Sequence, residues 1–177
     1  MATPGTMPTH ILRFSVAVLM QRTPLANRWA SERWDPVEVL PVPAEAAVAG
    51  APVLVRDDAT CTQWRFDGHA LELHRSEAEG YHLNLVAPDP KVFVAWRTHD
   101  DPMDPPVFPV SVTVSYNEAA RMMDGGERVD AVPLPVAVRD WMAPFVAEHY
   151  KPEPRRKVRR NDPFAADTTR RDRGSRG

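Results

Sequence analysis

Prolines that separate short, alternating apolar runs limit the fold of this chain more than any other feature. The 177 residues include 19 prolines, roughly twice the usual share of ~5%. Residues 13–21 and 110–116 alternate apolar with polar side chains, as half-buried strands do. In the first run, four apolar residues share one face: Phe14, Val16, Val18 and Met20. Because proline removes a backbone donor and breaks helices, the pattern predicts a mainly β protein rather than a helical bundle.

The middle of the chain is typical of short strands joined by tight turns. Strand-like runs occur at residues 37–42, 53–55, 60–66, 71–75, 81–85 and 92–96. Asp67-Gly68 is a strong hairpin signal, and residues 76–80 predict a second hairpin, between 71–75 and 81–85. In a symmetric second hairpin His74 faces His82 and Glu72 faces Asn84. The opposite, core face then carries four leucines: Leu71, Leu73, Leu83 and Leu85.

Helical periodicity replaces alternation after residue 116. Asn117 predicts the start of a helix through Met123, which ends at Gly125-Gly126. A later helix follows Pro135, and one apolar face of it comprises Val138, Trp141, Met142, Phe145 and Val146. Pro144 lies inside this helix and predicts a kink or an earlier end. The expected fold class is α+β, mainly β, with an antiparallel sheet or partly open barrel of seven to eight strands covered by a C-terminal helix.

Charge divides the chain into an acidic part and a basic part. Residues 1–150 hold 12 Lys and Arg against 20 Asp and Glu, whereas residues 151–177 hold 10 against 4. The basic segment has too few apolar residues to order itself. We therefore predict a flexible N-terminus (1–11), one globular β-rich domain with a C-terminal helix (12–150) and a disordered basic tail (151–177).

Several function classes are not expected from the sequence. No apolar run approaches the ~20 residues that span a bilayer, and the first residues lack the basic start of a signal peptide, so we expect a cytoplasmic protein. Cys61 is the only cysteine, which excludes an internal disulfide and a site made of cysteines alone. Phosphate-binding glycine loops, zinc-finger spacings and nucleophile elbows are absent from the sequence. We therefore predict no catalytic residue, no cofactor and no metal.

Two Arg-Trp pairs form the most distinctive segment, and they are the candidate partner-binding residues: Arg28, Trp29, Arg33 and Trp34. Tryptophan and arginine are enriched at interface hot spots. The two rings could instead stack a nucleobase or flat cofactor, with the arginines holding phosphates. The interpretation that we favour is a hydrophobic clasp across the sheet or helix, with the arginines extended to solvent.

A metal or cofactor site is the alternative to partner binding. In the predicted second hairpin His74, His82 and Glu72 share the polar face, and two imidazoles with a carboxylate can bind zinc or ferrous iron. Any solvent-exposed hairpin would show such a polar face. A shift of one residue in the turn would also separate the pair.

The basic tail could bind nucleic acid through counterion release. It carries only Phe164 as an aromatic residue and adjoins an acidic domain, which would repel a phosphate backbone. We therefore do not expect nucleic acid as a partner, and we expect no membrane partner.

Three groups of residues give the chain a resemblance to a known family. They are Asn27-Arg28-Trp29-x4-Trp34-Asp35-Pro36-x2-Val39-Leu40-Pro41; Leu71-Glu72-Leu73-His74-Arg75-x4-Gly80-Tyr81-x-Leu83-Asn84-Leu85; and Val110-x-Val112-Thr113-Val114, Tyr116, Glu118, Ala119 and Val132-Pro133-Leu134-Pro135 leading to Trp141, Phe145 and His149. With these residues the chain resembles the domain of unknown function 3305 family of small bacterial proteins, often encoded near formate dehydrogenase genes.

The resemblance covers about residues 12–155 and implies a context rather than a catalytic residue. It implies a non-enzymatic accessory or protein-binding module, linked to formate dehydrogenase maturation or assembly. The expected partner is then a protein, such as a formate dehydrogenase subunit or a maturation factor.

Overall fold

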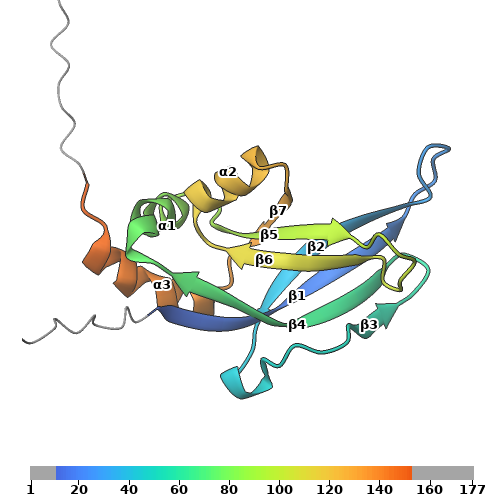
Figure 1. Cartoon of the computed structure of the whole chain (residues 1–177), viewed down its shortest axis with the longest axis horizontal. Coiled ribbons are helices and arrows are strands. Elements are labelled where there is room, and N and C mark those ends of the chain that lie inside the picture. The colour runs from blue at the N-terminus through green and yellow to red at the C-terminus, as the bar shows by residue number, and fades with distance from the viewer. Residues whose placement is uncertain (1–10, 153–177) are drawn as a thin grey trace, which may run out of the picture.

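A computed structural model describes residues 11–152 of the protein, and Figure 1 gives its overall arrangement. In this range the elements are β1 (Leu12–Pro24), β2 (Glu32–Pro41), β3 (Val53–Asp57), β4 (Thr62–Leu73), α1 (Ala78–Leu85), β5 (Lys91–Thr98), β6 (Val107–Thr113), α2 (Tyr116–Asp124), β7 (Arg128–Pro133) and α3 (Val136–His149), with 3-10 turns at Ala44–Ala46 and Arg75–Glu77. The predicted basic tail lies almost entirely outside the described residues, as does the predicted flexible N-terminus.

The seven described strands form two antiparallel sheets, so the mainly β fold class is confirmed. One sheet has the order β2-β1-β4-β3 and the other has the order β6-β5-β7. The strands β2 and β7 lie near each other, as do β4 and β6, but no strand pairing joins the two sheets within residues 11–152. The described strands therefore form two separate sheets rather than one sheet or a closed barrel.

The middle of β1 is buried more completely than the predicted alternation implies. Every residue from 16 to 20 is buried, including Ala17 and Leu19, which the alternation places on the opposite face from the core. β1 pairs with β2 on one side and with β4 on the other. An interior position alone does not cause this burial, because β4 is also interior and yet keeps partly exposed residues between its buried ones.

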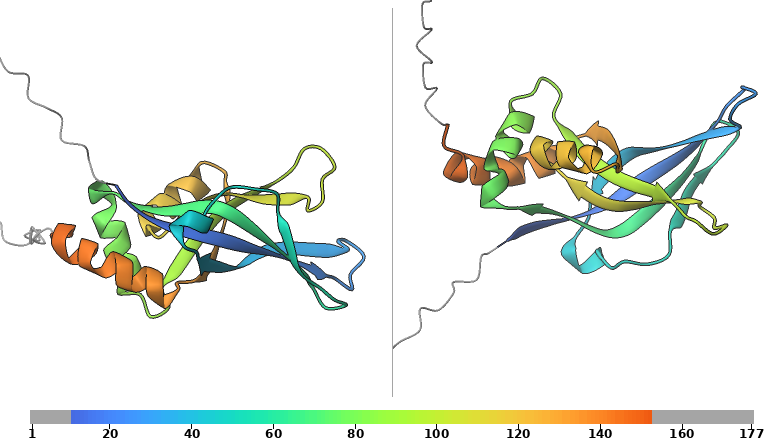
Figure 2. Two further views of the ribbon diagram at one scale, coloured as in Figure 1. Left: turned by 90° about the horizontal axis from the view of Figure 1, so that it is seen from below. Right: turned by 45° about the horizontal axis from the view of Figure 1, so that its top comes forward.

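One hydrophobic core is shared by both sheets and by helices α1 and α3. The predicted apolar face of the last helix is confirmed for four residues that are buried in this core: Val138, Met142, Phe145 and Val146. Trp141 is partly buried, with its ring 5.2 Å from that of Phe14. The helix continues through Pro144 to His149, so the predicted earlier end is wrong. α3 packs beside α1 (Figure 2), and its covering of the sheet stays a prediction.

The hairpin predicted at Asp67-Gly68 is wrong, because β4 runs through both residues without a turn. Gly68 has a φ of +87°, a value that glycine adopts at little energetic cost. The register of the β1–β4 pair shifts at this level, between Val16 and Val18. Gly68 therefore lies at a bulge, which bends the strand instead of reversing it.

The strand predicted over residues 81–85 is also wrong, because these residues belong to helix α1. Tyr81 and Asn84, three residues apart, are fully buried, whereas Leu83 is exposed. Spacing of three places two side chains on one helical face, and the polar groups of both residues are satisfied there. The Tyr81 hydroxyl donates to the carbonyl of Glu72 at 3.2 Å and accepts from the backbone N–H of His74 at 3.0 Å.

Helix α2 ends within one residue of its predicted end but begins two residues earlier than predicted. Its capping residue is Ser115, whose hydroxyl accepts from the backbone N–H of Glu118 at 3.1 Å, rather than the predicted Asn117. The short strand β7 was not predicted. Across the described residues, every helix is too short or too polar to traverse a lipid bilayer.

Candidate functional site

The loop between β1 and β2 holds Trp29 in an ordered but exposed position. The side chain of Asn27 accepts from the backbone N–H groups of Trp29 and Ala30, at 2.9 and 2.7 Å. The Trp29 ring is 83% exposed, and the guanidinium carbon of Arg28 lies 4.5 Å from its centroid. The favoured clasp interpretation is therefore wrong for Trp29, which contributes nothing to the core.

Trp34, in contrast, is partly buried against the core from strand β2. Its indole N–H donates to Glu32 at 2.9 Å. Arg33 is paired with Asp35, whose carboxylate lies 2.5 Å from the arginine Nε. The clasp interpretation thus describes Trp34. The four predicted partner-binding residues do not form one surface, because Trp29 faces solvent and Trp34 packs inward.

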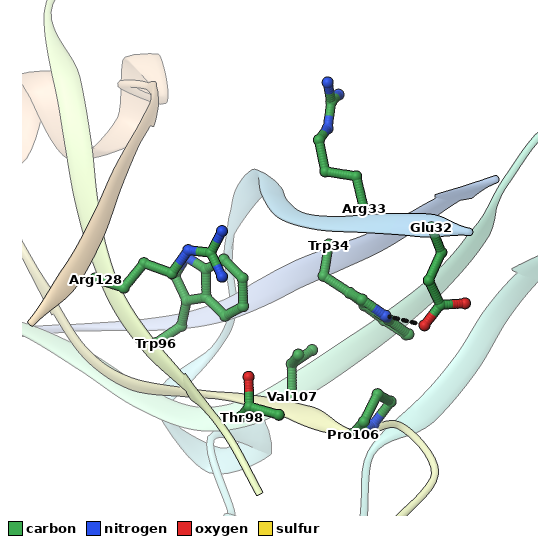
Figure 3. Close-up of a pocket in the computed structure, with 8 residues that line it drawn as sticks. All are labelled: Glu32, Arg33, Trp34, Trp96, Thr98, Pro106, Val107 and Arg128. Carbon is green, nitrogen blue, oxygen red and sulfur yellow. Dashed lines mark hydrogen bonds between the residues drawn. The ribbon is translucent and has the colours of Figure 1, made fainter. Parts of the chain in front are cut away.

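Trp34 lines a pocket of about 370 Å³ together with residues from three other strands (Figure 3). We call this the tryptophan pocket, and its lining is Glu32, Arg33, Trp34, Trp96, Thr98, Pro106, Val107 and Arg128. A pocket of this volume falls within the ~300–1,000 Å³ typical of small-molecule sites. Strand β2 forms one wall, and strands β5 and β7 of the other sheet form the facing wall.

Trp96 and Arg128 form the wall that the sequence analysis missed. Trp96 is 1% exposed, and its indole N–H donates to Asp130 at 2.7 Å. The guanidinium of Arg128 lies over the Trp96 ring, 4.1 Å from its centroid. Such stacking orients a guanidinium and leaves its N–H groups free to donate in their own plane. The only local signal of this wall in the sequence was Trp96, which ends a predicted strand. Its stacking partner, Arg128, lies in β7, which was not predicted.

A second, more polar pocket of about 320 Å³ lies between β4 and β6 and contains two of the three predicted metal-site residues, His74 and Glu72. Its other titratable residues are His69 and Glu118. Glu72 is engaged by Arg13 at 3.0 Å and by His74 at 3.4 Å. Burial lowers the pKa of His69, which favours a neutral imidazole. These groups can donate hydrogen bonds to a polar ligand, accept hydrogen bonds from it and exchange protons with it.

His82, the third predicted metal-site residue, does not join this second pocket through the predicted hairpin. It belongs to α1 and stacks on Tyr150, with ring centroids 4.0 Å apart. Within residues 11–152, no group of three His, Cys, Asp or Glu side chains is arranged to hold a metal ion. The hairpin geometry on which the metal hypothesis depended is therefore wrong.

Strand β3 exposes three consecutive aliphatic residues at the edge of its sheet. Val53, Leu54 and Val55 are each about half exposed. Among the strands of residues 11–152, β3 pairs only with β4, so its other edge carries backbone groups that no described strand pairs with. Exposed apolar side chains on an open edge are typical of segments that pair with another chain.

The comparisons with known proteins identify a family without assigning an activity. Neither a curated protein nor a solved structure matches the chain. A family model matches residues 15–159, which include both pockets, strand β3 and the Trp29 loop. The chain therefore belongs to the family described as "Protein of unknown function (DUF3305)".

Proposed function

We propose that this protein is a non-enzymatic protein-binding module whose contact surface lies at the end of the four-stranded sheet. The observation that carries the proposal is the exposure of Trp29 on an ordered loop. A free tryptophan ring in water forgoes the burial of ~150–250 Å² of apolar surface. Because the loop is already held in shape, little conformational entropy is lost when a partner covers the ring.

Strand β3 supports the proposal, since it ends beside the same loop. Arg22 of β1 pairs in register with Trp34 of β2 and with Thr62 of β4, and Thr62 pairs with Asp57 at the end of β3. One row of residues thus crosses the sheet just before both loops. Figure 1 shows the β1–β2 loop and the β3–β4 turn projecting from the same end of the molecule.

The family resemblance indicates the kind of partner. Proteins with these motifs are often encoded near formate dehydrogenase genes, so we propose a formate dehydrogenase subunit or a maturation factor as the partner, bound in the cytoplasm. Gene neighbourhood supplies an association only. An apolar patch of that partner would cover the proposed contact surface.

A quantitative affinity capture from the native host tests the proposal. The bait is the full chain, compared with Trp29→Ala and with a control variant, Val86→Ala. Val86 is also an exposed apolar residue, and it directly follows α1. Figure 1 shows α1 at the opposite end of the molecule from the β1–β2 loop. Hot-spot tryptophans contribute about 2 kcal/mol or more on truncation, so we expect Trp29→Ala to reduce recovery of the oxidoreductase-related partner severely.

Two outcomes would contradict the proposal in different ways. Equal recovery of that partner by Trp29→Ala would show that the contact surface lies elsewhere. Recovery of no formate dehydrogenase subunit or maturation factor above a mock bait would remove the accessory role itself. Recovery with Val86→Ala should equal that of the wild type.

A further inference from the structure

The tryptophan pocket has two unlike walls, separated by a space that no described side chain fills. Trp34 presents its ring from one sheet, while the stacked pair of Trp96 and Arg128 faces it from the other (Figure 3). Val107 and Thr98 lie beneath the space between them. A flat group entering the pocket would therefore contact an aromatic face on one side and a guanidinium edge on the other.

Each charged residue of the lining except Arg128 lies beside a side chain of opposite charge. Glu32 lies 3.8 Å from Arg22 and also accepts from the Trp34 indole. Arg33 is paired with Asp35. Arg128 has no carboxylate within ion-pairing distance in the described part of the chain. Arg128 is thus the one charged lining residue without an ion pair among residues 11–152.

Arg128 is well suited to recognise an anion because its orientation is set by contacts other than an ion pair. It stacks on Trp96, which is in turn held by its hydrogen bond to Asp130. A planar guanidinium forms two parallel hydrogen bonds with a carboxylate or a phosphate. Since the stacked geometry exists before a ligand arrives, those donors need little reorganisation on binding.

Trp34 supplies the complementary apolar contact. Its indole N–H is occupied by Glu32, which fixes the ring plane and leaves the ring face as its remaining binding surface. A flat unsaturated ring stacks favourably on such a face. Pro106 and Val107 extend the apolar lining at the same side of the pocket.

We propose that the tryptophan pocket binds a small, flat, unsaturated ring that carries one anionic substituent. The ring stacks on Trp34, and the anionic group accepts two hydrogen bonds from Arg128. Trp29 lies outside the lining of this pocket, so this site is separate from the proposed partner surface. Either proposal can therefore fail without the other.

A matched set of naphthalene probes tests the charge preference directly. The probes are 2-naphthoate and 2-naphthyl phosphate as anions, 2-naphthamide as a neutral analogue and 2-naphthylmethylammonium as a cation. Binding to the full chain is measured by calorimetry and by the shifts of the indole N–H resonances in a ¹H–¹⁵N spectrum. The chain has five tryptophans, and each gives its own resonance, so the site is reported as well as the affinity.

We expect the anions to bind at least about tenfold more tightly than the amide, since a hydrogen bond to a charged group contributes ~1.5–3 kcal/mol. The resonances of Trp34 and Trp96 should shift most. In Arg128→Gln, the anions should lose this advantage, while the amide should bind as before. The control Arg139→Gln removes an exposed arginine of α3 outside the pocket and should bind as the wild type does.

Three results would overturn the proposal. One is equal binding of 2-naphthoate and 2-naphthamide by the wild type. Another is a preference for 2-naphthylmethylammonium, which would assign recognition to Glu32 instead. The third is the lack, for every probe, of saturable binding that shifts the Trp34 and Trp96 resonances. Because Arg128 is exposed, its variant should keep the wild-type far-ultraviolet circular dichroism and urea midpoint, which shows that it is folded. Trp34→Phe retains a stacking ring and should therefore keep the preference for the anions.

Discussion

Replacing Asn84 with leucine should remove a large part of the free energy of unfolding. The Asn84 side chain is fully buried and makes three hydrogen bonds. It donates to the carbonyls of Lys91 and Val114, at 2.7 and 2.9 Å, and accepts from the Lys91 N–H at 2.9 Å. These bonds tie α1 to the start of β5 and to the end of β6. Asn84→Leu leaves three backbone groups unpaired, each costing ~1–3 kcal/mol, so the net loss should be about 3–5 kcal/mol after the gain from burying leucine.

Urea unfolding followed by circular dichroism measures this loss. With a slope of about 2 kcal/mol per molar urea, the midpoint should fall by roughly 2 M. The control Asn117→Leu alters a half-buried asparagine of α2 and should change stability by less than ~0.5 kcal/mol. A loss below about 1 kcal/mol for Asn84→Leu would refute the reasoning, because the carbonyls would then be satisfied without the amide.

Two further predictions concern packing and pH. Gly80→Ala should destabilise the protein by ~1–3 kcal/mol, because the added Cβ would overlap the Ser115 hydroxyl oxygen, whereas in Gly125→Ala it would meet nothing closer than 3.4 Å; thermal unfolding of both variants measures the difference, and equal midpoints would contradict it. Burial lowers the pKa of His69 below the ordinary 6.5, so the unfolded chain binds the proton more readily and stability should fall as the pH drops through 6.5. Urea midpoints between pH 7.5 and 5.5 should depend less on pH in His69→Gln, and an unchanged slope would exclude His69 as a source of this dependence.

The sequence predicted those parts of the fold that local pattern encodes. Alternation located β1, a short apolar run located β5, and spacing of three and four located the buried face of α3. The same reasoning failed where a residue serves a distant contact. Gly68 marks a bulge because β4 continues beside β1, and the amide of Asn84 bonds from α1 to the start of β5 and to Val114, which follows β6. Neither cause is visible in a window of ten residues.

The candidate site likewise has one part that the local sequence predicted and one part that depends on distant contacts. The exposed loop around Trp29 was singled out from its own residues, although the favoured interpretation buried its ring. The tryptophan pocket was not predicted, because Trp34, Trp96 and Arg128 come from three strands in two sheets. Only the packing of those sheets brings an arginine at residue 128 near a tryptophan at residue 34.

The open edge of β3 has a consequence for the solubility of the protein. Three adjacent aliphatic side chains border backbone groups that have no neighbouring strand among residues 11–152, so the edges of two copies can pair at high concentration. Overproduction of the protein alone should therefore favour aggregates, and co-production with a chain that covers β3, such as the partner proposed above, should keep the protein dispersed. The ratio of the two chains in the cell, rather than the amount of either, would then govern how much of this protein stays in solution.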